Sequence, residues 1–115
     1  MAIGTDRLIV DERTELTTKL YEIDLTGATN IIGTKWDDFA TRPSLEQVAL
    51  ASADIKSVSK APRFDSADFP DILGKIEGMA LLGDGSLALI NDDDFGITGG
   101  RTQIVVVHGT GIARR

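Results

Sequence analysis

The sequence contains no cysteine, and this absence excludes disulfide bonds, zinc sites built on thiolates and a cysteine nucleophile. Aromatic residues make up only 5% of the chain, so a core has to be built mainly from Leu, Ile, Val and Ala. No apolar run approaches the length of a membrane span. Residues 1–10 lack a basic stretch followed by a long apolar one, so no signal peptide is recognised.

Basic residues are in the minority, with 12 Lys and Arg against 18 Asp and Glu, for a formal net charge of −6. An acidic surface repels phosphate backbones, which disfavours nucleic acid as a partner. The same charge is compatible with a bound divalent cation, because clustered carboxylates gain from a counterion. The length of 115 residues suits a single domain, 1–115, and a hydrophobic content of 42% is enough for a core of moderate size.

The first two thirds of the chain contain three strand-like segments and one helix-like segment. Short β-branched or alternating runs predict strands over Arg7–Val10, Lys19–Leu25 and Val58–Phe64, the last confined by Pro62 to an edge or an end. In Leu45–Ala51 the apolar residues recur at helical spacing after Ser44, a residue that can cap a helix while Gln47 reaches back to its amide. We therefore expect mostly β structure with one short helix.

The last third predicts an antiparallel meander. Strands are expected over Lys75–Leu82, Leu87–Ile90 and Thr102–His108, and the Asp-Gly pair within 83–86 supplies the tight turn of the first hairpin. The Gly-rich, basic tail Gly109–Arg115 is expected to be frayed.

The densest group of polar residues is the run 91–94, with the sequence Asn-Asp-Asp-Asp. Consecutive carboxylates repel one another, and a hard cation such as calcium would hold them in a shell of carboxylate and backbone oxygens. Asp and Asn also favour plain solvated loops, because they bond their own backbone. Both interpretations stay open on the pattern alone.

Glu77 interrupts an otherwise apolar strand and is followed by Gly78, which permits close approach of a ligand or another backbone. The predicted hairpin places Glu77 beside the loop that starts at Asn91, so the two acidic groups would meet at one end of the sheet. The alternative is an ion pair of Glu77 with Lys75 or Arg101 on an exposed edge. Glu12, at the end of the first strand, either faces the same site or is solvated.

Other catalytic arrangements are disfavoured. His108 is the sole histidine, and the sequence has no Gly-x-Ser-x-Gly elbow to supply a serine nucleophile for it. A Walker A loop is also missing.

Two segments carry a resemblance to a known family. Lys75-Ile76-Glu77-Gly78-Met79-Ala80 and Asn91-Asp92-Asp93-Asp94-Phe95-Gly96 resemble the phytase-like domain family, whose members are also called "esterase-like activity of phytase" proteins. The upstream segments Leu8–Arg13, Lys19–Leu25 and Gly27–Asn30 are similar to the same family. The resemblance covers most of the chain.

The resemblance implies a β-propeller whose inner strands direct acidic residues at a central channel, with phosphoester or ester hydrolysis and a secreted or cell-envelope location in bacteria. Carried over to this sequence, the metal ligands would be Glu77, Asn91, Asp92, Asp94 and Glu12, with calcium as the expected ion. The catalytic residues are not assigned by the resemblance.

The length departs from a complete propeller. A blade takes roughly 40 to 45 residues and a ring needs at least four blades, so this chain would form two to three blades. We therefore expect a C-terminal fragment of a phytase-like propeller that self-associates through unpaired strand edges. The alternative to a hydrolase is a non-catalytic metal-binding or structural β module.

Overall fold

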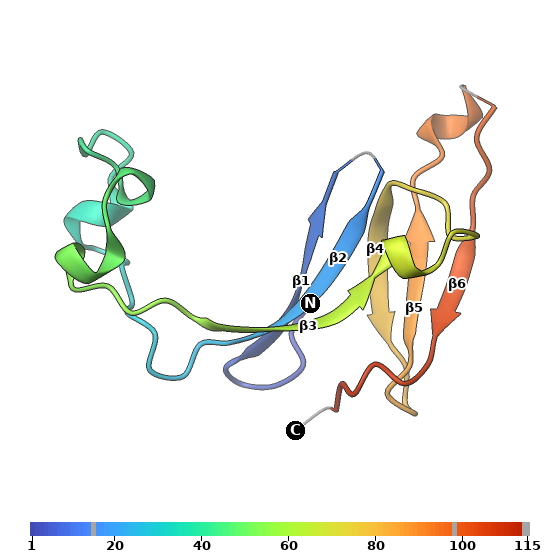
Figure 1. The fold of residues 1–115 in the computed structure, drawn as a ribbon, viewed down its shortest axis with the longest axis horizontal. Coiled ribbons are helices and arrows are strands. Elements are labelled where there is room, and N and C mark those ends of the chain that lie inside the picture. Colours follow the sequence, from blue (N-terminus) through green and yellow to red (C-terminus); the bar gives the residue numbers. More distant parts are fainter. Residues whose placement is uncertain (15, 98, 114–115) are drawn as a thin grey trace. The chain divides into compact units, whose positions relative to one another are not determined.

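A computed structural model describes residues 1–14, 16–97 and 99–113, and the chain divides into two units. The first unit comprises Met1–Ile23 and Lys60–Arg115, and the second is the intervening Asp24–Ser59 (Figure 1). Of the predicted loops and tail, Glu15, Thr98, Arg114 and Arg115 lie outside the described residues.

The first sheet has the strand order β1 (Arg7–Arg13), β2 (Thr18–Asp24) and β3 (Ser59–Asp65). A hydrogen bond from the Thr14 amide to the Thr17 carbonyl, at 2.8 Å, closes the β1–β2 hairpin. The period of two seen in the sequence is confirmed on β2, because Thr18, Leu20 and Glu22 are buried. Pro62 lies in β3, which is an edge strand, one of the two alternatives predicted.

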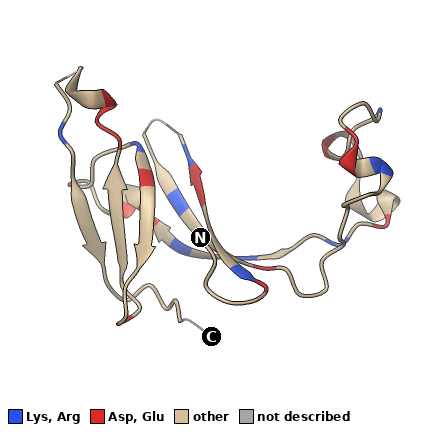
Figure 2. Cartoon of the chain, turned by 180° about the vertical axis from the view of Figure 1, so that it is seen from behind, with Lys and Arg blue, Asp and Glu red and all other residues tan. Residues whose placement is uncertain are grey.

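The second sheet is the predicted meander of β4 (Ile76–Leu81), β5 (Leu87–Asn91) and β6 (Ile104–Val107). Gly85 adopts a φ of 83° in the β4–β5 turn, the left-handed conformation that the Asp-Gly pair predicts. Figure 2 shows acidic residues on β4 and on the loop after β5, whereas β6 carries no charged residue.

One core joins the two sheets of the first unit. Its buried side chains are Ile3, Ile9, Leu20, Phe64, Ile76, Leu81, Leu87, Leu89 and Ile112. The expectation of a frayed tail is wrong for residues 109–113, because Ile112 is 5% exposed and the Thr110 hydroxyl donates to the Gly85 carbonyl at 2.9 Å. A single isoleucine is enough to anchor this Gly-rich tail, because the core offers the side chain a fully apolar site.

Apart from its end residues, Asp24 of β2 and Ser59 of β3, the second unit contains no strand residue, and it contains no buried residue. Its helical segments are short 3-10 turns at Lys35–Asp37, Leu45–Gln47 and Leu50–Ala53. The predicted helix over Leu45–Ala51 is therefore wrong as one element: Val48 is extended at φ −114° and ψ 152°, and this interrupts it. The predicted cap is present, with the Ser44 amide donating to Gln47 Oε1 at 2.9 Å.

The expectation of a mainly β chain is confirmed as two three-stranded antiparallel sheets, and the described residues form no α-helix. Accordingly, none of the described segments forms a helix of the length and apolarity that crossing a membrane requires.

Candidate functional site

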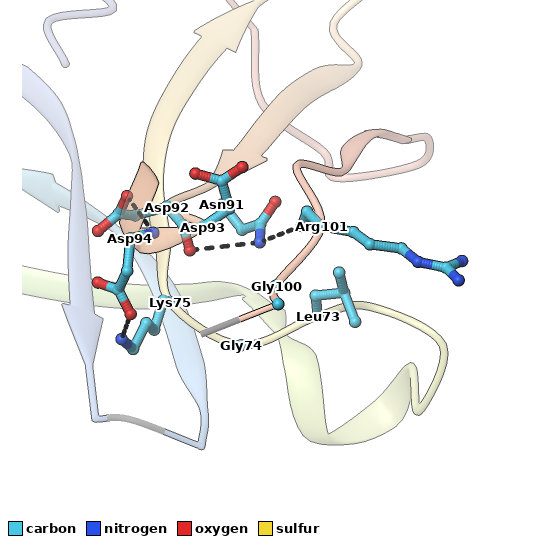
Figure 3. Close-up of a pocket in the computed structure, with 10 residues that line it drawn as sticks. Leu73, Gly74, Lys75, Asn91, Asp92, Asp93, Asp94, Gly100 and Arg101 are labelled. Carbon is cyan, nitrogen blue, oxygen red and sulfur yellow. Dashed lines mark hydrogen bonds and ion pairs between the residues drawn. The ribbon is translucent and has the colours of Figure 1, made fainter. Parts of the chain in front are cut away.

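A cavity of about 370 Å³ opens where the strands β4 and β5 meet their flanking loops. Residues 73–75, 91–94 and 99–101 line it (Figure 3). Three of its ten lining residues are aspartates and two are basic, so the cavity is polar and carries charges of both signs. It lies at the loop that the sequence singled out as the densest acidic group.

The backbone around this cavity is strained. Four non-glycine residues of the described chain have positive φ, and three of them are here: Lys75 at 57°, Asp94 at 52° and Phe95 at 58°. The left-handed region costs a side-chain-bearing residue of order 1 kcal/mol, so it persists where the surroundings hold it in place. The cavity is thus built from segments whose conformation is fixed against their intrinsic preference.

Cross-loop hydrogen bonds provide that fixation. Asn91 Oδ1 accepts from the Gln103 amide at 2.5 Å, and Asn91 Nδ2 donates to the Arg101 carbonyl at 3.0 Å. The Thr102 hydroxyl donates to Asp93 Oδ2 at 2.7 Å. These three bonds join residues 91 and 93 to residues 101–103, and Asn91 contributes to them with both ends of its side-chain amide.

Gln103 is a positioning residue that the sequence analysis missed. Its Oε1 accepts from the Leu73 amide at 2.8 Å, and its Nε2 donates to the Asp71 carbonyl at 3.0 Å. The side chain therefore joins the loop before β4 to the residue that directly precedes β6. No local pattern announces a glutamine of this kind, because both of its partners lie about 30 residues away in the chain.

The pocket acid Asp94 forms an ion pair with Lys75 (Figure 3). The hydrogen bond from Lys75 lowers the pKa of Asp94, so this carboxylate stays ionised well into the acidic range. Asp92 Oδ1 accepts the Asp94 amide at 3.0 Å. Arg101 lies at the rim and extends away from both aspartates.

Glu77 lies at an irregularity in β4. The β4–β5 register pairs Ile76 with Asn91 and Gly78 with Ile90, and the extra residue between them is Glu77. Such a bulge changes the direction of the side chain it carries. Glu77 forms an ion pair with Arg13 of β1 and is not among the residues that line the cavity.

The predicted neighbourhood is therefore present, while a shared cavity is not shown. The hairpin does bring the start of β4 beside Asn91, and the Asp92 amide donates to the Lys75 carbonyl at 2.8 Å. Glu12 points to the other face of β1, where it pairs with Lys60. That one ion bridges Glu77 and the aspartates stays a prediction.

The residues present do not form a preformed metal site. Glu77, Asp94 and Glu12 each hold a basic side chain of the protein, respectively Arg13, Lys75 and Lys60. Across the described ranges, no three acidic or histidine side chains gather closely enough to hold an ion. Carboxylates that already have internal counterions must exchange them before they can bind calcium.

Asp11 is a second residue that sequence reasoning passed over. It shares the buried face of β1 with Ile9, and its Oδ1 is fully buried without a hydrogen-bond partner in the described chain. Burial raises its pKa, Arg13 opposes this, and Glu77 adds to it. The alternation along β1 is the sequence signal that could have found Asp11. Because Ile9 points inward, the residue two positions on, Asp11, points toward β4 and Glu12 does not.

His108 takes no part in the cavity. Its Nδ1 lies 2.7 Å from the Ser86 hydroxyl, but Ser86 is only 3% exposed, which leaves no access for an ester. The pair joins the β4–β5 turn to the end of β6, so its role is structural.

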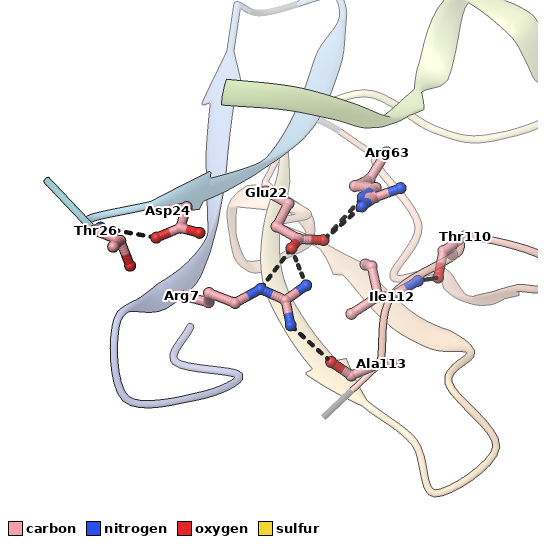
Figure 4. A network of polar contacts seen from close by, with 8 residues as sticks. All are labelled: Arg7, Glu22, Asp24, Thr26, Arg63, Thr110, Ile112 and Ala113. Carbon is pink, nitrogen blue, oxygen red and sulfur yellow. Dashed lines mark hydrogen bonds and ion pairs between the residues drawn. The ribbon is translucent and has the colours of Figure 1, made fainter. Parts of the chain in front are cut away.

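A buried polar network holds the first sheet together (Figure 4). Glu22, 8% exposed, accepts from Arg7 Nε at 2.8 Å and from Arg63 Nε at 2.9 Å. Burial by itself would raise the pKa of Glu22, but the hydrogen bonds from both arginines outweigh it and the pKa is lowered. Because the carboxylate is saturated, this network stabilises the fold rather than binding a substrate.

Comparison with known proteins gives one match. A family model described as "Phytase-like: Esterase-like activity of phytase" matches residues 1–95, a span that contains β1 to β5 and the acidic loop as far as Phe95. No curated protein and no solved structure matches the chain.

Proposed function

The chain belongs to the phytase-like family with esterase-like activity, and from this membership we propose that it is a hydrolase domain acting on phosphoesters or related esters. The single observation that supports this site assignment is the strained, charged cavity, whose Lys75 and aspartates 92–94 lie inside the matched span. Strain of this kind concentrates where a protein binds or reacts.

The cavity offers two chemical functions. The ammonium of Lys75 is held at the wall by Asp94, where it would attract a phosphate or ester oxygen. Asp92, beside that ion pair, supplies a carboxylate that would accept a proton from an attacking water. The propeller architecture and a secreted or cell-envelope location are expectations of the same family proposal.

Turnover of chromogenic substrates tests the proposal directly. We expect the wild type to hydrolyse para-nitrophenyl phosphate or para-nitrophenyl acetate, and Lys75→Met and Asp92→Asn to lose at least about tenfold in kcat/KM. Asp6→Asn is the matched control, since Asp6 is an exposed aspartate outside the cavity. A wild type without turnover, with or without calcium, would favour the non-catalytic structural module instead.

Calcium binding is a separate part of the proposal and depends on an exchange of counterions. If Asn91, Asp92 and Asp94 take up calcium, the ammonium of Lys75 has to leave Asp94. Lys75→Met should then bind calcium several-fold more tightly than the wild type, measured by calorimetric titration, whereas Lys56→Met, in the second unit, should not. The double variant Asp92→Asn/Asp94→Asn should give no heat. Absence of heat in both the wild type and Lys75→Met would contradict the proposal that the chain binds calcium.

A further inference from the structure

The basic side chains of the first unit are almost all paired with carboxylates, and Arg101 is the exception. Within the described residues of this unit, the basic residues that form ion pairs are Arg7, Arg13, Lys19, Lys60, Arg63 and Lys75. The guanidinium of Arg101 forms no ion pair and donates no hydrogen bond to any described residue. Arg101 is therefore the one cation in the described part of this unit that has no internal counterion.

The backbone that carries Arg101 is nonetheless held in place. Its carbonyl accepts from Asn91 Nδ2 at 3.0 Å, and the hydroxyl of the next residue, Thr102, donates to Asp93 Oδ2 at 2.7 Å. On the other side, a Cβ on Gly100 would lie 3.3 Å from the Asp93 carbonyl oxygen, so the glycine allows the two segments to approach closely. These contacts fix the Cα of Arg101 at the cavity wall and leave its side chain unbound.

The cavity has two chemically different sides. Figure 3 shows Lys75, Asp92 and Asp94 on one side and Arg101 on the other, where it extends away from the aspartates. The wall beside Arg101 is apolar, because Leu73 lines it and is 40% exposed. A substrate whose ester bond lies at Lys75 and Asp92 would therefore extend along Leu73 toward the guanidinium.

The charges of the cavity make Arg101 important for an anionic substrate. Three aspartates against two basic residues leave the lining with one negative charge in excess, and Lys75 is already paired with Asp94. This lining repels an anion unless a free cation compensates for it. A guanidinium is suited to that task, because it binds a carboxylate or phosphate through two parallel hydrogen bonds.

We propose that Arg101 is a specificity-determining residue that binds an anionic oxygen group, a carboxylate or phosphate, on the part of the substrate that does not react. This inference rests on the proposed hydrolase function and adds a substrate class to it: an ester with a second, anionic group remote from the reacting bond. Arg101 lies beyond the matched residues 1–95, so the assignment comes from the cavity of this chain and not from its family.

Two pairs of matched substrates test the role of Arg101. Para-acetoxybenzoate and para-carboxyphenyl phosphate carry a carboxylate opposite the ester, whereas para-acetoxybenzamide and para-carbamoylphenyl phosphate carry a neutral amide of similar shape. In Arg101→Gln, the ratio of kcat/KM between the carboxylate and the amide substrate should fall at least about fivefold, mainly through a higher KM for the carboxylate. Arg101→Lys keeps the charge without the planar fork and should recover part of the ratio. Lys56→Gln, in the second unit, is the control and should keep the wild-type ratio.

A purely structural role of Arg101 gives a different result. It would lower kcat/KM equally for both members of a pair, because the two esters need the same cavity. An equal loss for both members, or a ratio that does not change in Arg101→Gln, would overturn the inference.

Anion binding at Arg101 is also measurable without turnover, and this measurement decides the inference if none of the esters is hydrolysed. Benzoate and inorganic phosphate, titrated separately at low ionic strength, should shift the amide NMR signals of residues 99–101 in the wild type and in Lys75→Met, but not in Arg101→Gln. The larger shift identifies the preferred anion. Such shifts without hydrolysis would contradict the hydrolase proposal and leave the anion site standing. Without hydrolysis, a wild type that shows no shifts, or an Arg101→Gln variant that keeps them, would overturn the inference.

Discussion

Glu22 shows how one residue can set the pH dependence of this fold. The carboxylate is 8% exposed and lies between the guanidinium groups of Arg7 and Arg63. Removing one member of such a group leaves the others partly buried and uncompensated. Since the pKa of Glu22 is lowered in the folded chain from its ordinary value of 4.5, its contribution to stability is present above 4.5 and disappears as the pH falls through the lower, folded value.

We predict that Glu22→Gln lowers the free energy of unfolding by about 2 kcal/mol at pH 7, less than for a fully buried pair because both arginines remain partly exposed. The loss should shrink as the pH drops below 4.5, because the unfolded wild type then takes up a proton at Glu22 that the folded chain still excludes. Urea unfolding of the wild type and the variant from pH 7 to pH 3 measures the loss of unfolding free energy and its dependence on pH. Equal destabilisation at every pH would show that packing, and not charge, accounts for the role of Glu22.

Residues paired across the sheets were beyond sequence reasoning. Arg13 and Glu77 are separated by 64 positions in the chain. The sequence predicts only Lys75 or Arg101 as an ion-pair partner of Glu77. Local pattern singled out the acidic residues, because carboxylates beside apolar strands stand out, and their role as metal ligands stays a prediction. It could not identify their counterions, since that depends on which strand of one sheet faces which strand of the other.

At the scale of elements, β4 depends on a close approach at Gly78. A Cβ there would lie 2.4 Å from Ile90 Cγ2, so any larger residue has to displace the side chain opposite it. The glycine also lies directly after the irregularity that carries Glu77. Gly78 is thus constrained by packing against β5, because its Cβ position is already occupied.

Gly78→Ala should therefore cost about 1–3 kcal/mol of unfolding free energy. The cost should fall when Ile90→Ala is combined with it, because the clash is removed, and a double-mutant cycle from urea curves gives the coupling. Gly83→Ala is the control: nothing lies within 4 Å of its Cβ position, so its effect should stay within about 0.5 kcal/mol. Purely additive effects of Gly78→Ala and Ile90→Ala would contradict the contact.

All six strands of the described residues could be predicted, from alternation in β2 and from β-branched or apolar runs and turn residues in the others. Two local patterns predict the backbone geometry directly: the alternation in Lys19–Leu25 and the Asp-Gly turn of the β4–β5 hairpin. The helix over Leu45–Ala51 was wrong because apolar spacing there has no core to face: its unit contains no buried residue. Helical periodicity predicts a stable helix only where a second surface covers the apolar side.

At the scale of the whole first unit, the two sheets are joined by the segment 109–113. Ile112 enters the common core, Thr110 bonds the β4–β5 turn, and Arg7 Nη1 of β1 donates to the Ala113 carbonyl at 3.5 Å. Gly85 leaves space for this segment, because a Cβ there would lie 2.9 Å from the Ile112 carbonyl oxygen. The segment therefore contacts elements of both sheets, although it forms no strand.

Cooperative unfolding of both sheets should depend on this segment. Ile112→Ala is expected to lower the free energy of unfolding by about 3 kcal/mol through the cavity it leaves, which is a large share of the stability of a domain of this size. Ile97→Ala removes the same atoms from a residue that is 83% exposed and should change stability by less than about 0.5 kcal/mol. Hydrogen exchange adds the spatial test: if residues 109–113 join the sheets, protection falls in β1–β2 and in β4–β5 together in Ile112→Ala. Loss of protection confined to one sheet would mean that the core is two separate cores, each stabilised on its own.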